Sequence, residues 1–164
     1  MSLTLIFVLV IGLGAVAWLV GRARAGRFAQ PASTTSRAHS LPGYHGAYVA
    51  LWTALPTLLF AIVWAGVSPG LVTQRVIASP AAASLAADPF ARPAILSEAR
   101  GLAEGTLQTA FNPAAEALAP EYKAAKLHYG LIGLVLAAIL AFAGGLYAFT
   151  RVRPDFRART SVER

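Results

Sequence analysis

The residues best suited to ligate a metal or to transfer a proton are three histidines, His39, His45 and His128. No two of them stand four residues apart, the H-x-x-x-H spacing that places two imidazole rings on one face of a helix. We therefore interpret each histidine as an interfacial polar residue, and predict no metal site. The sequence contains no cysteine, which excludes disulfides, thiolate nucleophiles and cysteine-based metal sites.

Motifs for nucleotide binding and for covalent catalysis are also absent from the sequence. It contains no G-x-x-x-x-G-K-[ST] loop, whose backbone amides would surround a phosphate, and no G-x-S-x-G turn, which would expose a nucleophilic serine. Gly12 and Gly14 lie inside an uncharged apolar run, where helix packing explains them better than phosphate binding. We predict that the chain is not an enzyme and binds no cofactor.

The composition is too apolar for an ordinary water-soluble enzyme of this size. Apolar residues make up 57% of the 164 residues and charged residues only 13%, whereas about 25% charged residues is usual. A small soluble fold exposes much of its surface and needs more polar side chains than this. The net charge of +7 does not indicate nucleic acid, because the basic residues cluster beside apolar runs without interleaved aromatics. The lipid bilayer is the expected solvent.

Three apolar runs are long enough to cross a bilayer as helices: residues 2–21, 46–74 and 127–150. Twenty helical residues span about 30 Å, the thickness of the hydrocarbon core. Lipid admits separate spans only as helices, because every backbone amide needs an internal partner. A cleaved signal peptide is the alternative for the first run. It is disfavoured because the positive charges follow this run, whereas they precede the apolar stretch of a signal peptide.

These runs predict an all-α membrane protein with three transmembrane helices and a short helical extracytoplasmic segment between the second and the third. The predicted order is helix 1 (1–21), an arginine-rich cytoplasmic loop (22–45), helix 2 (46–74), a periplasmic amphipathic helical segment (75–126), helix 3 (127–150) and a basic cytoplasmic tail (151–164).

The charges between the spans set the expected orientation. The loop 22–45 holds four arginines and no acid, the tail 151–164 holds five arginines and two acids, and the segment 75–126 holds five basic and five acidic residues. Short loops rich in Lys and Arg remain on the cytoplasmic side. We therefore predict a multi-pass protein in contact with the lipids of a bacterial inner membrane, with a periplasmic N-terminus and a cytoplasmic C-terminus. The arginines that set this topology are Arg22, Arg24, Arg27, Arg37, Arg151, Arg153, Arg157 and Arg159.

The segment 75–126 has the pattern of a partly solvated helical element. After Pro93, apolar residues recur at helical spacing as far as Phe111, with Glu98 and Glu104 on the opposite side. This pattern predicts an amphipathic helix.

A second short helix is predicted to begin at Asn112-Pro113, a typical cap and first residue, and to end where Pro120 interrupts it. We interpret the two helices as a compact hairpin lying on the membrane face. A docking platform for a periplasmic partner is the alternative.

One face of the third span carries only small residues, which recur at every fourth position: Gly133, Ala137, Ala141 and Gly145. Such a face lets another helix approach closely, and in lipid close packing supplies much of the energy of helix association. An alanine-rich helix also produces such a run by chance, so a packing face and a chance pattern both remain open.

The run Leu41–Pro56, LPGYHGAYVALWTALP, resembles the segment that opens the second helix in the amino-terminal extension of bacterial phosphate ABC-transporter permeases of the PstC type. The order of elements is similar as well, from the initial span and arginine-rich stretch to the third span and arginine-rich tail. The residues that carry the resemblance are Leu41, Pro42, Gly43, Tyr44, Gly46, Tyr48, Trp52 and Pro56.

The resemblance implies a role in the import of inorganic phosphate. In such transporters a cytoplasmic ATPase subunit drives import, a periplasmic phosphate-binding protein delivers the substrate, and a second permease subunit pairs with the first. The permease core of the family follows this extension, whereas the sequence stops at Arg164. We therefore expect an N-terminal membrane region, as a fragment or a separately encoded piece, that scaffolds or anchors the transporter and does not transport on its own. The alternative is a free-standing small accessory protein that stabilises or assembles a larger membrane complex.

The predicted orientation can be tested with single cysteines, because the natural chain has none. In intact cells, an impermeant thiol reagent should label Ser97→Cys, in the segment expected outside, and leave Ser36→Cys unlabelled until the cells are opened. Labelling of Ser36→Cys in intact cells, without labelling of Ser97→Cys, would overturn the topology.

Overall fold

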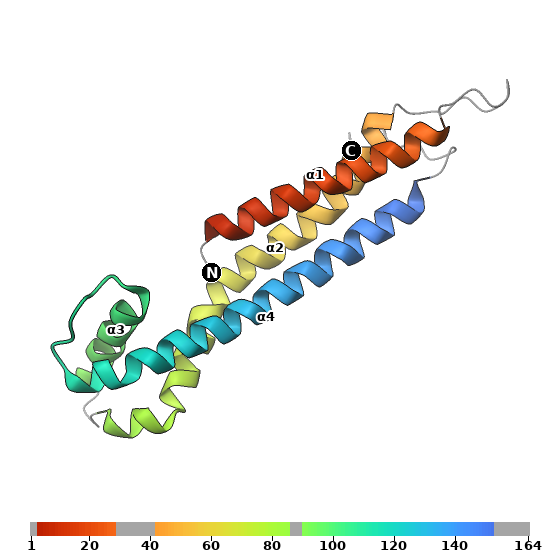
Figure 1. Ribbon diagram of the computed structural model, residues 1–164. Coiled ribbons are helices and arrows are strands. Elements are labelled where there is room, and N and C mark those ends of the chain that lie inside the picture. The colour runs from red at the N-terminus through yellow and green to blue at the C-terminus, as the bar shows by residue number, and fades with distance from the viewer. Residues whose placement is uncertain (1–2, 29–41, 86–89, 153–164) are drawn as a thin grey trace. The chain divides into compact units, whose positions relative to one another are not determined.

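The computed structural model describes residues 3–28, 42–85 and 90–152, which are helical over most of their length (Figure 1). The helices are α1 (Leu3–Phe28), α2 (Pro42–Ile77), the short 3-10 helix η1 (Pro80–Ser84), α3 (Ala91–Glu104) and α4 (Pro113–Arg151). No strand occurs in these ranges. Three helices, α1, α2 and α4, are long and apolar enough to cross a membrane, which confirms the predicted all-α class.

The long helices extend beyond the apolar runs that predicted them. α1 continues past Gly21 as far as Phe28, and α2 begins at Pro42 and ends at Ile77. The helical backbone does not stop where the apolar residues stop, because long arginine side chains carry their charge away from the helix axis while their stems stay on its surface. Both ends of the predicted 22–45 loop are therefore helical.

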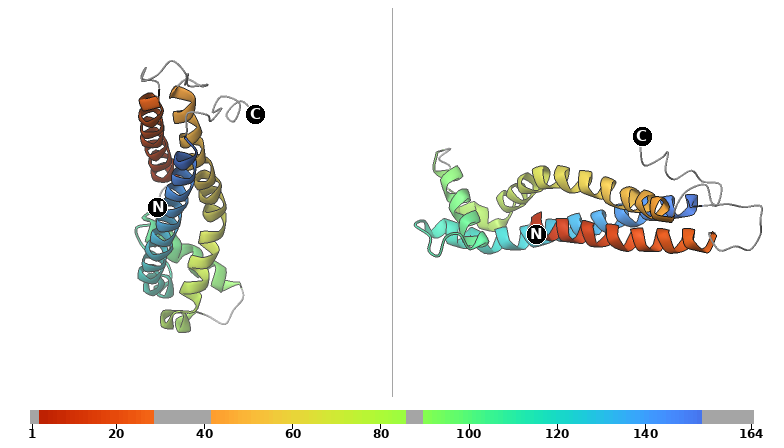
Figure 2. Two further views of the ribbon diagram at one scale, coloured as in Figure 1. Left: turned by 90° about the vertical axis from the view of Figure 1, so that its right-hand side faces the viewer. Right: turned by 90° about the horizontal axis from the view of Figure 1, so that it is seen from above.

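The chain forms two compact units. Unit 1 comprises Val63–Gly133, which holds the last part of α2, all of α3 and the first part of α4. Unit 2 comprises the flanking segments up to Ile62 and from Leu134. It holds α1, the first part of α2 and the last part of α4, which lie side by side (Figures 1 and 2).

The core of unit 1 is assembled from one face of each of its three helices. The contributing residues stand three, four or seven positions apart, which places them on one side of each helix. Three of them, Ala99, Ala115 and Leu118, have no exposed surface. The core consists of Val72 and Val76 from α2, Ile95 and Ala99 from α3, and Ala115, Leu118, Tyr122 and Ala125 from α4.

The amphipathic helix ends earlier than its apolar pattern predicted. α3 stops at Glu104 because Gly105 adopts the left-handed conformation, with φ 75° and ψ 15°, which glycine adopts without steric cost. The Thr106 amide then donates to the Gly101 carbonyl at 2.9 Å. The prediction that Phe111 belongs to the apolar face of this helix is wrong, since its side chain lies outside α3 and is 94% exposed.

The start of α4 is confirmed at the predicted cap. The Asn112 side-chain oxygen accepts a hydrogen bond from the Ala114 amide at 2.9 Å, which satisfies one of the amides left open at a helix N-terminus. The Glu98 carboxylate of α3 accepts from the amides of Phe111 and Asn112. The connection between α3 and α4 is therefore held by a carboxylate from the helix that precedes it.

The predicted break at Pro120 is wrong: α4 runs without interruption from Pro113 to Arg151, with Pro120 inside it. A proline inside a helix frees the carbonyl four residues earlier, here that of Glu116. Glu116 and Pro120 are both exposed, while Leu118 on the opposite face is buried in the core of unit 1. The predicted hairpin of two short helices is therefore replaced by α3 packed against the ends of two long helices.

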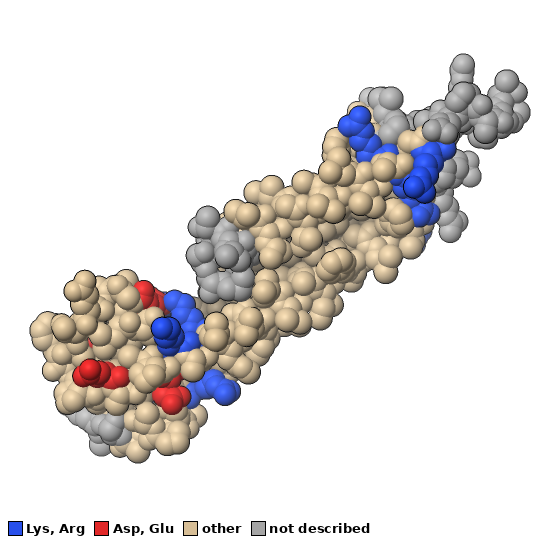
Figure 3. Space-filling view, viewed as in Figure 1, with Lys and Arg blue, Asp and Glu red and all other residues tan. Residues whose placement is uncertain are grey.

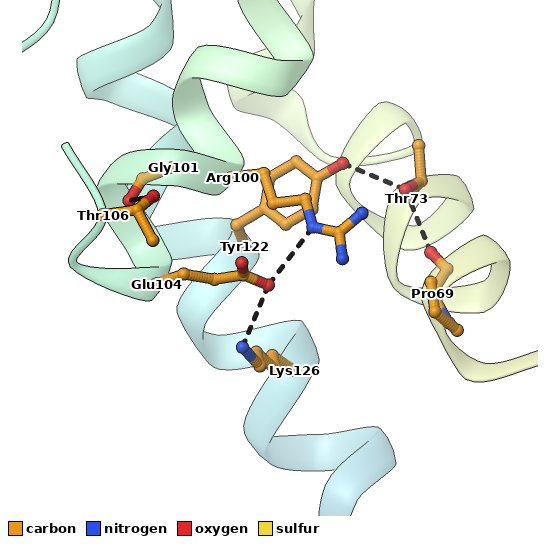
Figure 4. Close-up of polar contacts among 8 residues, drawn as sticks. All are labelled: Pro69, Thr73, Arg100, Gly101, Glu104, Thr106, Tyr122 and Lys126. Carbon is orange, nitrogen blue, oxygen red and sulfur yellow. Dashed lines mark hydrogen bonds and ion pairs between the residues drawn. The ribbon is translucent and has the colours of Figure 1, made fainter. Parts of the chain in front are cut away.

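Polar contacts join the helices of unit 1 at the edge of its core and at its surface (Figure 4). The Tyr122 hydroxyl of α4 lies 3.0 Å from the Thr73 hydroxyl of α2. One carboxylate oxygen of Glu104 accepts from Arg100 Nε at 3.2 Å and from Lys126 Nζ at 3.0 Å, so an ion pair connects α3 with α4. The hydrogen bond from Lys126 lowers the pKa of Glu104 below its ordinary value; burial opposes the shift and Arg100 adds to it.

The lowered pKa of Glu104 predicts that the contribution of its ion pairs to the stability of α3 depends on pH. Its ion pairs stabilise the fold above the unfolded pKa of about 4.3, and this stabilisation is lost as the pH falls through the lower folded value. An exposed ion pair contributes about 0.2–1 kcal/mol. At pH 7, Glu104→Gln should therefore weaken the hydrogen-exchange protection of α3 amides severalfold in the detergent-solubilised chain.

The matched control is Glu121→Gln, because Glu121 is exposed and forms no ion pair within the described part of the chain. This variant should leave α3 protection unchanged. Equal protection of α3 in the wild type and in Glu104→Gln at pH 7 would contradict the assignment.

Candidate functional site

The family-like run lies at the start of α2, where α1 and α2 come close together in unit 2. A Cβ atom added at Gly46 would lie 2.7 Å from the Trp18 carbonyl oxygen, and one added at Gly21 would lie 3.1 Å from the Gly46 Cα. Distances this short leave no room for a side chain at either position. Gly46 and Gly21 therefore permit backbone contact between the two helices, which is the use of small residues in lipid.

The two glycines of the run differ in their surroundings. A Cβ at Gly43 would meet nothing within 4 Å, whereas a Cβ at Gly46 would collide with Trp18. His45, between them, is 2% exposed and is buried at the same contact, with its carbonyl oxygen 3.2 Å from a Cβ placed at Gly21. Only part of the motif is thus required by helix packing.

The small-residue face of α4 packs against α2 within each unit. In unit 1, a Cβ at Gly133 would overlap the indole ring of Trp64. In unit 2, Ala137 and Ala141 are buried, and a Cβ at Gly145 would lie 2.7 Å from the Thr53 hydroxyl oxygen. These contacts lie within the chain, and association with a helix of another chain through this face stays a prediction.

Gly144 is a packing residue that the four-residue pattern did not include. A Cβ added there would overlap the backbone carbonyl of Trp52 in α2. The signal available in the sequence was the pair Gly144-Gly145, since two adjacent small residues widen the surface through which a helix can approach its neighbour.

The buried polar side chains of unit 2 are Thr53, Thr57 and His45. The Thr53 hydroxyl donates to the Val49 carbonyl at 2.9 Å, and the Thr57 hydroxyl donates to the Thr53 carbonyl at 2.7 Å. Both bonds run along α2 itself, so these hydroxyls are satisfied without water or a ligand. No Asp, Glu, Lys or Arg side chain lies buried in the described part of unit 2.

One end of unit 2 is purely basic in its described residues, and Figure 3 shows blue side chains gathered there, where α1 ends. Arg24 Nε donates to the Val152 carbonyl at 3.3 Å, and its guanidinium carbon lies 4.2 Å from the centre of the Phe149 ring. The C-terminal ends of α1 and α4 therefore lie together, and a positive charge at a helix C-terminus is favourable. The described charged residues of unit 2 are Arg22, Arg24, Arg27 and Arg151.

Aromatic rings accompany these arginines. The Trp52 and Tyr147 rings are 5.1 Å apart, and the Tyr48 ring lies 6.3 Å from Trp52. The guanidinium carbons of Arg22 and Arg151 lie 5.1 Å from Trp18 and 5.2 Å from Tyr147. Aromatic rings beside arginines are typical of the level at which a helix passes from hydrocarbon to water.

Several predicted residues cannot be placed. Leu41, Arg37 and His39 and the tail arginines Arg153, Arg157 and Arg159 lie outside the described residues. Within those residues no group of three His, Asp or Glu side chains stands close enough to hold a metal ion.

A protein-family model described as phosphate ATP-binding cassette transporter matches residues 5–164. The chain belongs to this family. No curated protein and no solved structure matches the chain significantly. The family confirms the resemblance drawn from Leu41–Pro56, and it describes a transporter component rather than an enzyme. Together with the three long apolar helices, it indicates a membrane protein that acts with other subunits of a phosphate transporter.

The two glycines of the family-like run provide a matched test of the α1–α2 contact. Gly46→Ala should lower the free energy of unfolding by about 1–3 kcal/mol, the usual cost of forcing an extra methyl group into close packing. Gly43→Ala should be neutral or slightly stabilising, because its Cβ meets open space and alanine favours a helix.

The measurement is the midpoint of thermal unfolding of the two variants in the same detergent, followed by circular dichroism. Equal midpoints for Gly46→Ala and Gly43→Ala would show that the close approach at Gly46 is not used.

Proposed function

We propose that the chain is the N-terminal membrane region of a phosphate ABC-transporter permease, which anchors and scaffolds the transporter and does not itself form the path for phosphate. The observation that carries this proposal is the match of residues 5–164 to the phosphate transporter family. The apolar runs of the same chain contain no Asp, Glu, Lys or Arg.

A phosphate path needs polar or charged groups at membrane depth. An anion inside hydrocarbon is costly unless side chains or backbone groups replace its water, and ionisable residues within spans are the usual sign of such a path. The buried hydroxyls of Thr53 and Thr57 donate to carbonyls of their own helix. The uncharged apolar runs, and hydroxyls that bond within their own helix, support an anchoring role.

The proposed partners are the second permease subunit, the cytoplasmic ATPase subunit and the periplasmic phosphate-binding protein. Large apolar side chains are exposed on the helices of unit 2, among them Ile11 on α1, Leu59 on α2 and Ile139 on α4. Such surfaces suit lipid and the spans of another membrane subunit equally. We place the basic end of unit 2 at the cytoplasmic side of the inner membrane, in accordance with the positive-inside rule.

The proposal predicts that the chain alone does not transport phosphate. Reconstituted into vesicles and supplied with labelled inorganic phosphate, the purified chain should give uptake equal to that of empty vesicles. Uptake above that of empty vesicles would refute the claim that these helices lack a phosphate path.

Association with the transporter is tested separately. A tagged chain purified from its own membranes in mild detergent should bring down the second permease subunit and the ATPase subunit. A control protein with the same tag and three apolar spans should not. Purification with other membrane proteins and without these subunits would favour the free-standing accessory protein.

A further inference from the structure

An apolar groove of about 250 Å³ lies on unit 2 between α1 and α4. Val16 and Val20 of α1 form one wall, and Phe142, Leu146 and Phe149 of α4 form the other. Among the described residues, the only polar side chain that lines the groove is Thr53 of α2, whose hydroxyl donates to the Val49 carbonyl. The groove thus presents hydrocarbon on both sides.

Such a groove does not bind water, because water needs polar partners that these walls lack. Between two helices apolar enough to cross a membrane, its walls suit an acyl chain or an apolar segment of protein. From Ala141 to Phe149 the groove follows eight residue steps of α4, about 12 Å of helix. Positive charge gathers at one end of the groove, and this favours an acyl chain attached to an anionic group over a wholly apolar helix.

Arg24 lies where the groove ends. It follows Val20 by four residues, so both lie on one face of α1, and its guanidinium carbon lies 4.2 Å from the centre of the Phe149 ring that lines the groove. Within the described residues, one of its five N–H donors is engaged, the Nε bonded to the Val152 carbonyl. Arg22, Arg27 and Arg151 add positive charge at this end, and no acid occurs in the described part of unit 2.

We propose that unit 2 carries a binding site for an anionic phospholipid, with one acyl chain in the groove and the headgroup phosphate held by Arg24. A guanidinium binds phosphate oxygens through several N–H donors at once, and basic pockets between membrane helices bind anionic headgroups. In the described part of unit 2 these arginines have no neighbouring acid, so they repel the cation of a zwitterionic headgroup and the site selects for net negative charge. This site is independent of the role proposed for the chain in phosphate import.

The headgroup part is tested by native mass spectrometry of the full chain released from nanodiscs that contain equal amounts of phosphatidylglycerol and phosphatidylcholine. The wild type should retain one phosphatidylglycerol in preference to phosphatidylcholine. Arg24→Gln should retain about tenfold less, which corresponds to the loss of about 1.4 kcal/mol. The control Arg92→Gln, at an exposed arginine of unit 1, should behave as the wild type.

The groove part is tested with two exposed valines of α1. Val16 lines the groove and Val8 does not, and both are more than half exposed. Val16→Phe should therefore displace the bound lipid, and Val8→Phe should leave it in place. Both variants alter exposed side chains, so this comparison remains informative if Arg24→Gln does not fold.

Four outcomes would overturn the proposal. They are equal retention of the two lipids, unchanged retention in Arg24→Gln, unchanged retention in Val16→Phe, and displacement of the lipid by excess inorganic phosphate. The third would show that no acyl chain lies in the groove. The fourth would show that the arginines bind the anion without the acyl chain.

Discussion

The structure depends on the close approach of helical backbones in a medium that offers no hydrophobic drive between helices. In lipid an apolar side chain is as well solvated on the surface as at a contact, so helices associate where small residues allow their backbones and side chains to touch. Gly46 against Trp18, Gly144 against the Trp52 carbonyl and Gly145 against Thr53 are such places in unit 2. A single added methyl group at any of these glycines would prevent the close approach. The arrangement of α1, α2 and α4 within unit 2 depends on these contacts.

The helices of unit 1 pack in a different way, through a core of larger side chains rather than through backbone contact. Val72, Ile95 and Leu118 are among these side chains. The Glu104 ion pair lies at the surface of unit 1, and the Tyr122–Thr73 hydrogen bond is partly buried. Each helix contributes one apolar face to this core, and the ion pair lies outside it. One chain thus uses backbone contact at small residues in one unit and an amphipathic core in the other.

The basic end of unit 2 connects the sequence pattern with the family. Arg24 fixes the end of α1 to the end of α4 through the Val152 carbonyl and the Phe149 ring, so the two arginine-rich stretches begin at the same place. A membrane protein that acts with other subunits needs a defined depth and orientation in the bilayer. Arginines and aromatic rings at one level provide both, which agrees with membership of a phosphate transporter family.

The apolar runs and their lengths were sufficient to determine the all-α class and the three long helices, because bilayer thickness and backbone hydrogen bonding leave few alternatives. The family was indicated by the resemblance of the run Leu41–Pro56. The Asn112 cap could also be predicted from the sequence, since capping is a local interaction. Gly105 was likewise a local C-terminal signal for α3, but the apolar pattern that continues to Phe111 outweighed it in the prediction. Only the tertiary structure decided that α4 continues through Pro120, because burial of Leu118 on the opposite face outweighs a local proline signal. It also decided that Gly46, and not Gly43, meets α1. Which of two glycines touches another helix depends on how that helix is rotated about its axis, and local sequence does not encode that rotation.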